Sequence, residues 1–517
     1  MIVEQHLADN HDVAHGVVER ALAACERGRD ESAACYAMIA ADLFWHNHAG
    51  TFASPELETM LSTLAGRLPD TPRLAHGQGD VLHVLTRAYP IGGHTRLARR
   101  WIEQDDQRSH SVLLTHQGRH APPAWLSEAV TASGGEVLRI DAMVSGLRNR
   151  AAALRAIATG YEQLVVHSHP DDVIPLMAFA DASKRPPVVF VNHADHVFWL
   201  GVAIGDVIAN LRRSADVLSL ERRGIEASRI VRVPIPIDTI TRHRSQTDAK
   251  ATLGVADNQV LAISVAAPYK FTPLDDDSDI LSLFVELVEA HPQLVVRIAG
   301  PSPEGRWARA QAATDGRLQA VGPVEDAALY YQAADLYFDS FPLTSATSIL
   351  EAGAFGAPPV ALRPAEFGGD LFQLDAPSLE AHACCFESVE DYKAQVERLV
   401  EHAEERRELG EAVAASVLAT HSGAGWIQTV HDAYRASKTR GAMPPDPLRC
   451  IRSQGSLDRK LALVHAHGRF SYDAAEAYRR HMRLLKSSDR VATWLRLAFS
   501  GGSPKLRFLL KQRVRAR

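Results

Sequence analysis

The sequence predicts an α/β protein with two doubly wound parallel sheets, an α-helical module in front of them and a basic helical extension behind. Short apolar runs alternate with helical stretches from Asp80 onward, which is typical of parallel sheets with helices on their faces. A proline-stiffened segment, residues 232–237, divides this alternation into two series. The length of 517 residues allows at least two domains, each with its own core.

The front module is predicted over residues 1–75. Ala, Leu and Glu recur at helical spacing over residues 17–45 and again over residues 54–68. The stretch 68–80 is rich in Pro, Gly and Asp and is expected to link this module to the first sheet.

The first sheet domain is predicted over residues 80–235 and the second over residues 236–435. In the first domain six apolar runs are predicted to be strands: 81–85, 111–114, 136–140, 163–166, 188–191 and 217–220. In the second domain five runs are predicted to be strands, and the long helical stretch 379–422 follows them: 260–264, 294–298, 318–321, 336–338 and 359–362. We expect the ligand site in the cleft between the two domains.

The composition is that of a soluble globular protein, with 46% hydrophobic and 23% charged residues. No apolar run approaches the roughly 20 residues of a membrane-spanning helix, and the acidic N-terminus does not resemble a secretory signal. The five cysteines show no metal-ligand spacing and suit a reduced, cytoplasmic chain.

The C-terminal extension, residues 441–517, is basic. It holds 17 Lys or Arg against five Asp or Glu, a net charge of +12, so the remaining residues carry −18 of the total of −6. Cations mix there with apolar residues such as Trp494 and Phe508, which suits peripheral contact with an anionic membrane. The alternative is a helix that packs on the body. Nucleic acid is not an expected partner, since no nucleic-acid motif accompanies the charge.

The segment 343–359, LTSATSILEAGAFGAPP, predicts a helix that binds phosphate. Thr344 or Ser345 can serve as its N-cap, and the unpaired N–H groups of its first turn attract an anion. Thr347 and Glu351 are four residues apart and share one face, so they could offer a hydroxyl to a diphosphate and a carboxylate to a ribose. The alternative is an ordinary buried helix with a good cap.

Lys270 follows the first strand of the second series, in APYKFTPL. It therefore lies at the carboxyl end of a strand, the edge at which open parallel sheets bind ligands. An ammonium there would neutralise a diphosphate, and the helix near Thr344 starts at the same rim. A solvated surface lysine is the alternative.

APYKFTP and the later SATSILEAGAFGAPPVAL together resemble the donor domain of GT-B glycosyltransferases, which have two Rossmann-like domains. They are similar in particular to the inverting group of O-linked N-acetylglucosamine transferases and bacterial protein N-glucosyltransferases. The resemblance implies that Lys270, Thr347 and Ser348 take the diphosphate and that Glu351 takes the ribose. Tyr269 and Ser345 complete the predicted nucleotide site.

Two positions depart from the patterns of known GT-B enzymes. The histidine that precedes the threonine pair in the inverting group is Ala346 here. A retaining GT-B enzyme would carry a second glutamate eight residues before Glu351, where this chain has Leu343. We therefore expect inversion.

Gly92, Gly93 and His94 follow the first strand of the first domain. Glycines allow a ligand to approach the backbone closely. Similar inverting enzymes place a histidine base after this strand, which implies that His94 deprotonates the acceptor, and a pKa near neutrality suits that role. A glycine turn with a surface histidine is the alternative.

A rival base lies in NHADHVFW, where Asp195 can orient a neighbouring histidine: His193 or His196. A divalent metal there is the weaker idea, because no other ligand cluster is apparent. The strand end VVHSHPDD offers a third polar edge without individual roles: His167, His169, Asp171 and Asp172. Glu366 and Asp370 either hold the hydroxyls of the sugar or cap a loop.

The sequence thus predicts a cytoplasmic, inverting glycosyltransferase that needs neither a metal nor a cofactor. Its donor is a nucleotide sugar, with UDP as the expected nucleotide, and its acceptor is a protein or a lipid-linked glycan. Two alternatives stay open, a nucleotide-sugar 2-epimerase on the same fold and a non-catalytic binding subunit.

Overall fold

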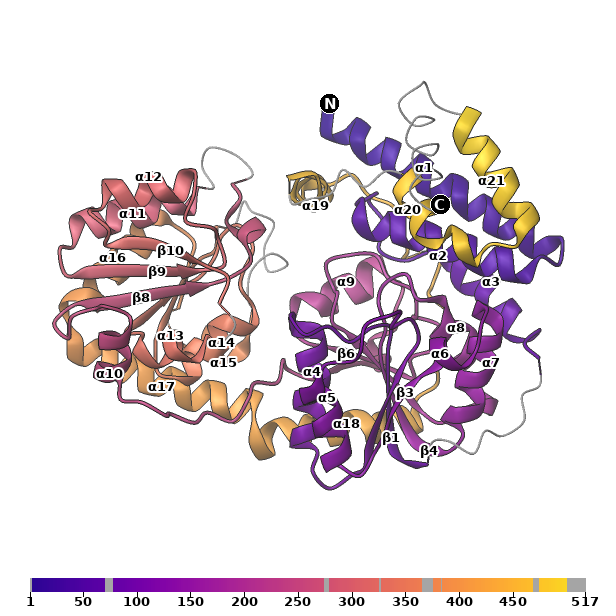
Figure 1. The fold of residues 1–517 in the computed structure, drawn as a ribbon, viewed down its shortest axis with the longest axis horizontal. Helices are drawn as coiled ribbons and strands as arrows, with labels where there is room; N and C mark the ends of the chain where they lie inside the picture. Colours follow the sequence, from indigo (N-terminus) through magenta and orange to yellow (C-terminus); the bar gives the residue numbers. More distant parts are fainter. Residues whose placement is uncertain are drawn as a thin grey trace.

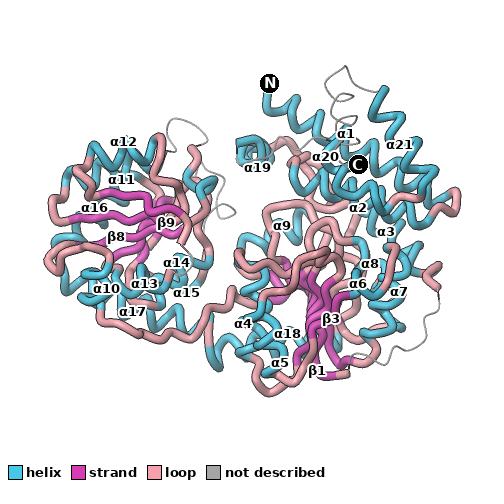
Figure 2. The backbone as a smooth tube through the Cα atoms, in the orientation of Figure 1, coloured by secondary structure: helices cyan, strands magenta, loops and turns pink. Residues whose placement is uncertain are grey.

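The computed structural model describes residues 2–69, 78–273, 279–324, 327–364, 375–382, 384–467 and 474–499. Figure 1 shows two lobes, each built on one sheet, with further helices stacked on the first lobe. The sheets lie inside their lobes and helices cover them (Figure 2). None of the described helices is both long and apolar enough to cross a bilayer.

The first sheet has seven parallel strands in the order β3-β2-β1-β4-β5-β6-β7. They are β1 (Gly79–Leu85), β2 (His110–Leu114), β3 (Val137–Arg139), β4 (Tyr161–His167), β5 (Val188–Asn192), β6 (Val207–Asn210) and β7 (Ile230–Arg232). The strand order reverses between β1 and β4. Their helices are α4 (Gly93–Gln104), α5 (Ala124–Ala132), α6 (Ile140–Met143), α7 (Leu147–Ala158), α8 (Val173–Phe179) and α9 (Ser214–Arg222).

The second sheet has six parallel strands in the order β10-β9-β8-β11-β12-β13. They are β8 (Val260–Val265), β9 (Leu294–Ala299), β10 (Leu318–Gly322), β11 (Leu336–Phe338), β12 (Pro359–Leu362) and β13 (Cys385–Phe386). The order reverses between β8 and β11. Around them lie α10 (Gln246–Thr252), α11 (Ile280–Ala290), α12 (Arg306–Ala313), α13 (Ala328–Ala333), α14 (Thr347–Ala354), α15 (Pro377–Glu380), α16 (Val389–Glu401) and α17 (Ala403–His421).

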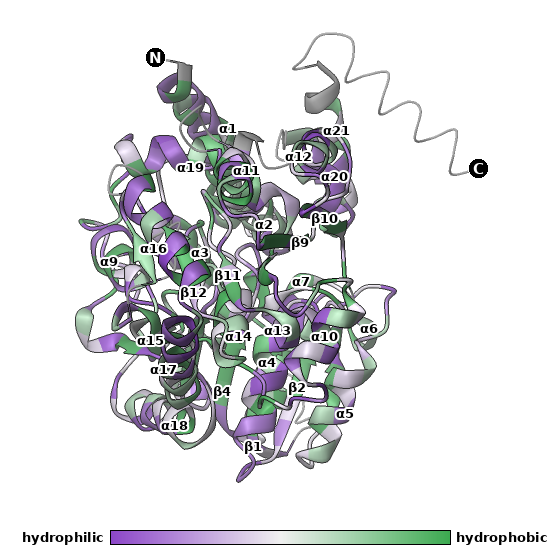
Figure 3. Cartoon of the chain, turned by 90° about the vertical axis from the view of Figure 1, so that its left-hand side faces the viewer, coloured by the Kyte–Doolittle hydropathy of each residue, from purple (hydrophilic) through white to green (hydrophobic). Residues whose placement is uncertain are grey.

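The two sheets follow from their apolar runs. Every residue of β2 and β9 is buried, as expected for strands covered by helices on both faces. Figure 3 shows the hydrophobic strands in green inside the molecule and hydrophilic purple on many of the outer helices.

The predicted helical module forms α1 (Ile2–Glu26), α2 (Asp30–His46) and α3 (Pro55–Ala65). Ser54 caps α3 by accepting from the N–H of Leu57. The C-terminal extension adds α19 (Ser456–His467), α20 (Ala474–His481) and α21 (Ser487–Phe499), and α19 and α20 pack on α1 and α2. One continuous apolar core joins α1, α2 and α3 to the first sheet. The module is therefore part of the first lobe.

Helix α18 (Gly423–Thr439) also belongs to the first lobe by its contacts. Trp426 and Tyr434 are buried against the first sheet, and the Trp426 indole donates to the carbonyl of Pro234 at 2.7 Å. The sequence places these residues in the second domain, so the chain returns to the first sheet earlier than expected, just after α17.

Three predicted elements differ from the structure. The run 217–220 lies in α9 and not in a strand: Ala215 and Leu218, three residues apart, are buried while Val217 is half exposed, which is helical spacing. The sixth strand is β6, another run of four residues. The stretch 379–422 is interrupted by β13, and strand β7 ends at the first residue of the expected crossing segment, Arg232.

Candidate functional site

A pocket of 360 Å³ lies between the two lobes. Its walls come from four parts of the chain, and α19 stands beside it in the space between the lobes (Figure 1). The lining side chains include Asn192, His193, Asp195 and Arg212 from the first sheet domain, Tyr269, Lys270, Thr344 and Ala346 from the second, Trp45 and His46 from α2, and Leu461, Val464 and His465 from α19.

Both sheets present their reversal points to this region. His94 follows β1 and His167 ends β4, the two strands at which the first sheet reverses. Lys270 follows β8, and the loop that leads into α14 follows β11, the two strands at which the second sheet reverses. Ligands of open parallel sheets bind at the carboxyl ends of strands at such points.

Lys270 ties the two loops of the second sheet together. Its ammonium donates to the carbonyl oxygen of Thr344 at 2.6 Å. Burial lowers the pKa of Lys270 to about 8, an effect that the Asp339 carboxylate opposes and the Arg212 cation adds to. Lys270 and Arg212 thus bring one cation from each domain to the pocket, and because Arg212 is paired with Asp195, Lys270 is the cation there that could bind an anion.

The start of α14 differs from the predicted cap. The residue before the helix is Ala346, whose side chain offers no oxygen, and neither Thr344 nor Ser345 caps the helix. Ala346 has φ +55° and ψ −79°, a left-handed backbone that a residue with a Cβ rarely adopts. The first-turn N–H groups of α14 thus lack a side-chain cap at the pocket, where an anion could accept from them.

The Ser345 hydroxyl is held away from the predicted role. It donates to the Asp339 carboxylate at 2.7 Å, its backbone N–H donates to the same oxygen at 2.9 Å, and it accepts from the Tyr337 hydroxyl at 2.8 Å. Ser345 therefore shapes the loop. Thr347 faces the first domain, because a Cβ built on Gly93 would lie 3.9 Å from the Thr347 hydroxyl oxygen.

Glu351 lies one turn into α14 and pairs with Arg100 of α4. The hydroxyl of Tyr331 interacts with both Ser348 and Glu351. The predicted ribose ligand is thus held at the domain interface by a cation and a phenol. Gly92 precedes α4 with φ +123°, a conformation that favours glycine, and leaves that helix uncapped as well.

His94 is one of four histidines that meet at the first sheet's edge. Its ring lies 4.5 Å from that of His193 and 5.4 Å from that of His169, measured between centroids. Its Nε2 donates to the carbonyl oxygen of His167 at 2.5 Å, so Nδ1 carries the lone pair. Burial lowers the pKa of His94, and it lowers the pKa of His193 to about 3. Both rings are neutral near pH 7 and can accept a proton.

Asp195 is committed to Arg212. Two hydrogen bonds of 2.5 and 2.8 Å join the guanidinium to the carboxylate, and His196 Nδ1 lies 3.3 Å from the same group. Burial alone would raise the pKa of Asp195, but Arg212 outweighs it and holds that pKa well below its usual range. The predicted His193–Asp195–His196 group is thus split, because Asp195 orients His196 and not His193.

Several lining residues were not predicted from the sequence: Trp45, His46, Arg212, Leu461, Val464 and His465. Only Arg212 gives a local signal, since it follows β6 at the carboxyl edge. Glu366 and Asp370 lie outside the described residues.

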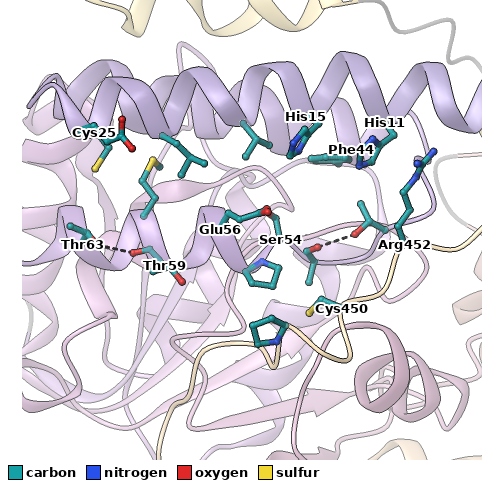
Figure 4. Close-up of a pocket in the computed structure, with 18 of the residues that line it drawn as sticks. His11, His15, Cys25, Phe44, Ser54, Glu56, Thr59, Thr63, Cys450 and Arg452 are labelled. Carbon is teal, nitrogen blue, oxygen red and sulfur yellow. Dashed lines mark hydrogen bonds between the residues drawn. The ribbon is translucent and has the colours of Figure 1, made fainter.

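A second, larger hollow of 780 Å³ lies between α1 and α3 (Figure 4). His11, His15 and Glu56 border it, and none of the predicted site residues is among the described residues that line it. In the described part of the chain, one buried group has ligand atoms within 4.8 Å of one another and could hold a metal: Asp42, Asp171 and His481. It joins α2 and α20 to the loop after β4.

Comparisons with known proteins agree with the two-sheet fold. A protein-family model described as glycosyl transferase-like matches residues 281–432. A glycosyltransferase from Rickettsia africae ESF-5 has a similar structure, with a TM-score of 0.54 and 11% identity over 70% of this chain and 99% of that chain. The chain has the GT-B fold of glycosyltransferases. The predicted resemblance and the predicted fold class are thereby confirmed.

Two further GT-B structures are similar. Anabaena HepE, solved in complex with UDP, has a TM-score of 0.52 and 13% identity over 69% of this chain and 100% of that chain. An O-GlcNAc transferase of Thermobaculum terrenum has a TM-score of 0.49 and 18% identity over 83% of each chain. No curated protein sequence matches the chain.

Proposed function

We propose that this GT-B protein is an inverting glycosyltransferase that moves a sugar from a UDP-sugar to a protein or a lipid-linked glycan. The observation that carries the proposal is the two-sided pocket. One side offers Lys270 and the start of α14, and the other offers His193 and Arg212, with His94 next to His193 at 4.5 Å between ring centroids but not in the lining of the pocket. Anion-binding groups and a candidate base thus converge from different domains.

The donor side is suited to a diphosphate. The ammonium of Lys270 and the uncapped start of α14 lie at one wall of the pocket, and the Thr347 hydroxyl lies in the first turn of that helix, facing Gly93 of the first domain. Charge develops on the leaving diphosphate as the glycosidic bond breaks, and fixed cations and N–H groups stabilise it without reorganisation. Arg212 lines the same pocket but is paired with Asp195, so Lys270 and the N–H groups of α14 are the groups that would neutralise the diphosphate, and we propose that no metal is required. HepE binds UDP on the same fold, which supports UDP as the nucleotide.

The base side is suited to proton removal from an acceptor. His94 Nε2 is fixed by a carbonyl, so its Nδ1 is the basic nitrogen, and this atom is buried with no hydrogen-bond partner among the described residues. An acceptor O–H or N–H would give its proton to Nδ1 while its heavy atom attacks the anomeric carbon and UDP departs. A single displacement of this kind inverts the anomeric centre.

No free nucleophile competes with that displacement among the described pocket residues. Asp195, the carboxylate that lines the pocket, is held by Arg212 and is therefore poorly placed to attack the donor. A retaining enzyme of the glutamate type would need a carboxylate where this chain has Leu343.

The acceptor is proposed to enter beside the helical module. Trp45, Leu461 and Val464 form an apolar wall of the pocket, built from α2 and α19. The cytoplasmic location and the peripheral membrane contact of the basic extension stay predictions.

Incubation with UDP-glucose and UDP-N-acetylglucosamine, each with and without acceptor extracts, tests the proposal. We expect UDP release and, by NMR of the product, an anomeric configuration opposite to that of the donor. A 2-epimerase would convert UDP-N-acetylglucosamine to its epimer faster than it releases UDP. A binding subunit would bind UDP but release no UDP from either donor.

A further inference from the structure

Three buried histidines form a continuous hydrogen-bonded chain across the first sheet. His167 at the end of β4, His83 in β1 and His110 at the start of β2 are all fully shielded from solvent. His83 Nδ1 lies 3.0 Å from His167 Nε2, and His83 Nε2 lies 3.0 Å from His110 Nδ1. The register explains the contact: Leu85 pairs with His167 and Val81 pairs with His110, so His83 stands diagonally between the two rings.

The far end of this chain fixes the direction of every hydrogen bond. His110 Nε2 lies 3.0 Å from the carbonyl oxygen of Asp105, and since a carbonyl only accepts, Nε2 carries the hydrogen. Burial lowers the pKa of all three histidines, so each ring is neutral and has one N–H. It follows that His83 donates from Nε2 to His110 and that His167 donates from Nε2 to His83.

The near end leaves a lone pair close to the predicted base. His167 Nδ1 is buried and has no hydrogen-bond partner among the described residues. The carbonyl of the same His167 accepts from His94, and the two rings lie 6.4 Å apart, edge to face. Every ring therefore has its negative end, Nδ1, on the His94 side and its N–H on the side of the Asp105 carboxylate, 3.5 Å from His110.

We propose that this histidine wire, His167–His83–His110 anchored on Asp105, stabilises the positive charge that forms on His94 when it takes the proton of the acceptor. Aligned hydrogen bonds in a low dielectric polarise one another, so the lone pair at the near end gains electron density. This inference rests on the proposed function in one respect only: the acceptor of the transfer reaction is the source of the proton. His83, His110 and Asp105 act through His167 and are positioning residues.

The surroundings of the wire support an electrostatic role. The Trp101 indole lies roughly perpendicular to the rings of His83 and His167, with centroids 6.1 and 5.9 Å away. It is fully buried, so it keeps water from screening the wire. Its Nε1 donates to the Tyr434 hydroxyl at 2.8 Å, and that hydroxyl donates to Asp105 at 3.2 Å. A merely structural network would supply hydrogen-bond partners to the ring nitrogens of the wire without affecting the proton affinity of His94.

NMR of 15N-labelled histidine rings in the full chain tests the wire without turnover. We expect Nε2–H tautomers at the three wire positions in the wild-type protein. His83→Leu breaks the wire, and the measured pKa of His94 should then fall by about 1. The amide of His83→Gln can accept from His167 and donate to His110, so in this variant the pKa of His94 should fall less than in His83→Leu. The control His48→Gln changes a buried histidine outside the wire and should leave His94 unchanged.

Two results would overturn the inference. One is an Nδ1–H tautomer at any wire position in the wild-type protein. The other is an unchanged pKa of His94 in folded His83→Leu. If His83→Leu does not fold, His110→Leu replaces it, because this change removes the acceptor of the His83 N–H and so breaks the wire at its far end, and a fall in the pKa of His94 is again expected.

Turnover separates this inference from the proposed function. With a UDP-sugar that the wild type consumes, His83→Leu should lower kcat about tenfold, leave KM within about twofold and move the acid limb of kcat to lower pH. A wild type that neither binds UDP nor releases it from a UDP-sugar refutes the proposed function, whereas the NMR measurement still decides the wire.

Discussion

Arg100 on α4 forms an ion pair with Glu351 on α14, so the two helices that begin on opposite sides of the cleft are joined to each other. Arg100 is almost fully buried and also binds Asp238, directly after the crossing segment, at 2.6 Å. A single guanidinium therefore contacts both domains and their connection. Because Glu351 is the predicted ribose ligand, domain closure and donor binding share one carboxylate.

Replacement of Glu351 by Gln should weaken UDP binding about tenfold, because charge-assisted hydrogen bonds to the ribose hydroxyls are lost. Inorganic pyrophosphate has no ribose and should bind the variant and the wild type equally in calorimetry. An equal loss for both ligands would show that Glu351 acts through domain closure with Arg100 and does not hold the ribose.

UDP affinity should decline above about pH 8. Burial lowers the pKa of Lys270 to about 8, so the ammonium is charged below that pH and neutral above it. The phosphates of UDP stay ionised throughout this range, so the loss reaches at most about tenfold per pH unit. Lys270→Arg keeps its charge and should abolish the decline. A decline of the same size in that variant would assign the titration to another group.

Ala346→Gly should stabilise the protein by about 1 kcal/mol, because glycine adopts a positive φ without the steric cost that a Cβ imposes. Urea unfolding measures the change. Ala352→Gly, inside α14, is the matched control and should destabilise by about 1 kcal/mol. If Ala346→Gly and Ala352→Gly lowered the free energy of unfolding by the same amount, Ala346 would not be strained.

His94→Ala should lower turnover by about 10²- to 10⁴-fold and leave UDP affinity within about twofold, since the base does not touch the nucleotide. Stopped assays of UDP release and calorimetry give the two values. Turnover at the wild-type rate would transfer the role to His193 or His196, and the corresponding alanine variants decide between them.

Much of the fold could be predicted from short apolar runs. Strands β11 and β12 begin and end at the predicted residues, because turn-forming residues bound their apolar stretches. The run 217–220 was assigned to a strand wrongly, since four residues cannot distinguish a period of 2 from a period of 3.6. Strand β13 has two residues and no pattern of its own.

The site was predictable where topology alone brings residues together. Lys270 and the loop before α14 lie side by side because β8 and β11 are neighbours in the sheet. The apolar wall was not predictable, since Trp45 and Val464 are far apart in the sequence and carry no motif. The uncapped start of α14 was also not predictable, because the sequence offers the hydroxyls of Thr344 and Ser345 as caps, and in the fold neither of them caps the helix.

Titration calorimetry of UDP on the wild type and on Lys270→Ala/Thr347→Ala tests the central claim, a diphosphate held between Lys270 and α14, most directly. We expect binding to the wild type and at least about 30-fold weaker binding to the double variant, since a cation and a hydroxyl are lost. Lys393→Ala removes an exposed lysine of the same domain and should bind like the wild type. Equal UDP affinity in the folded double variant and the wild type would contradict the claim.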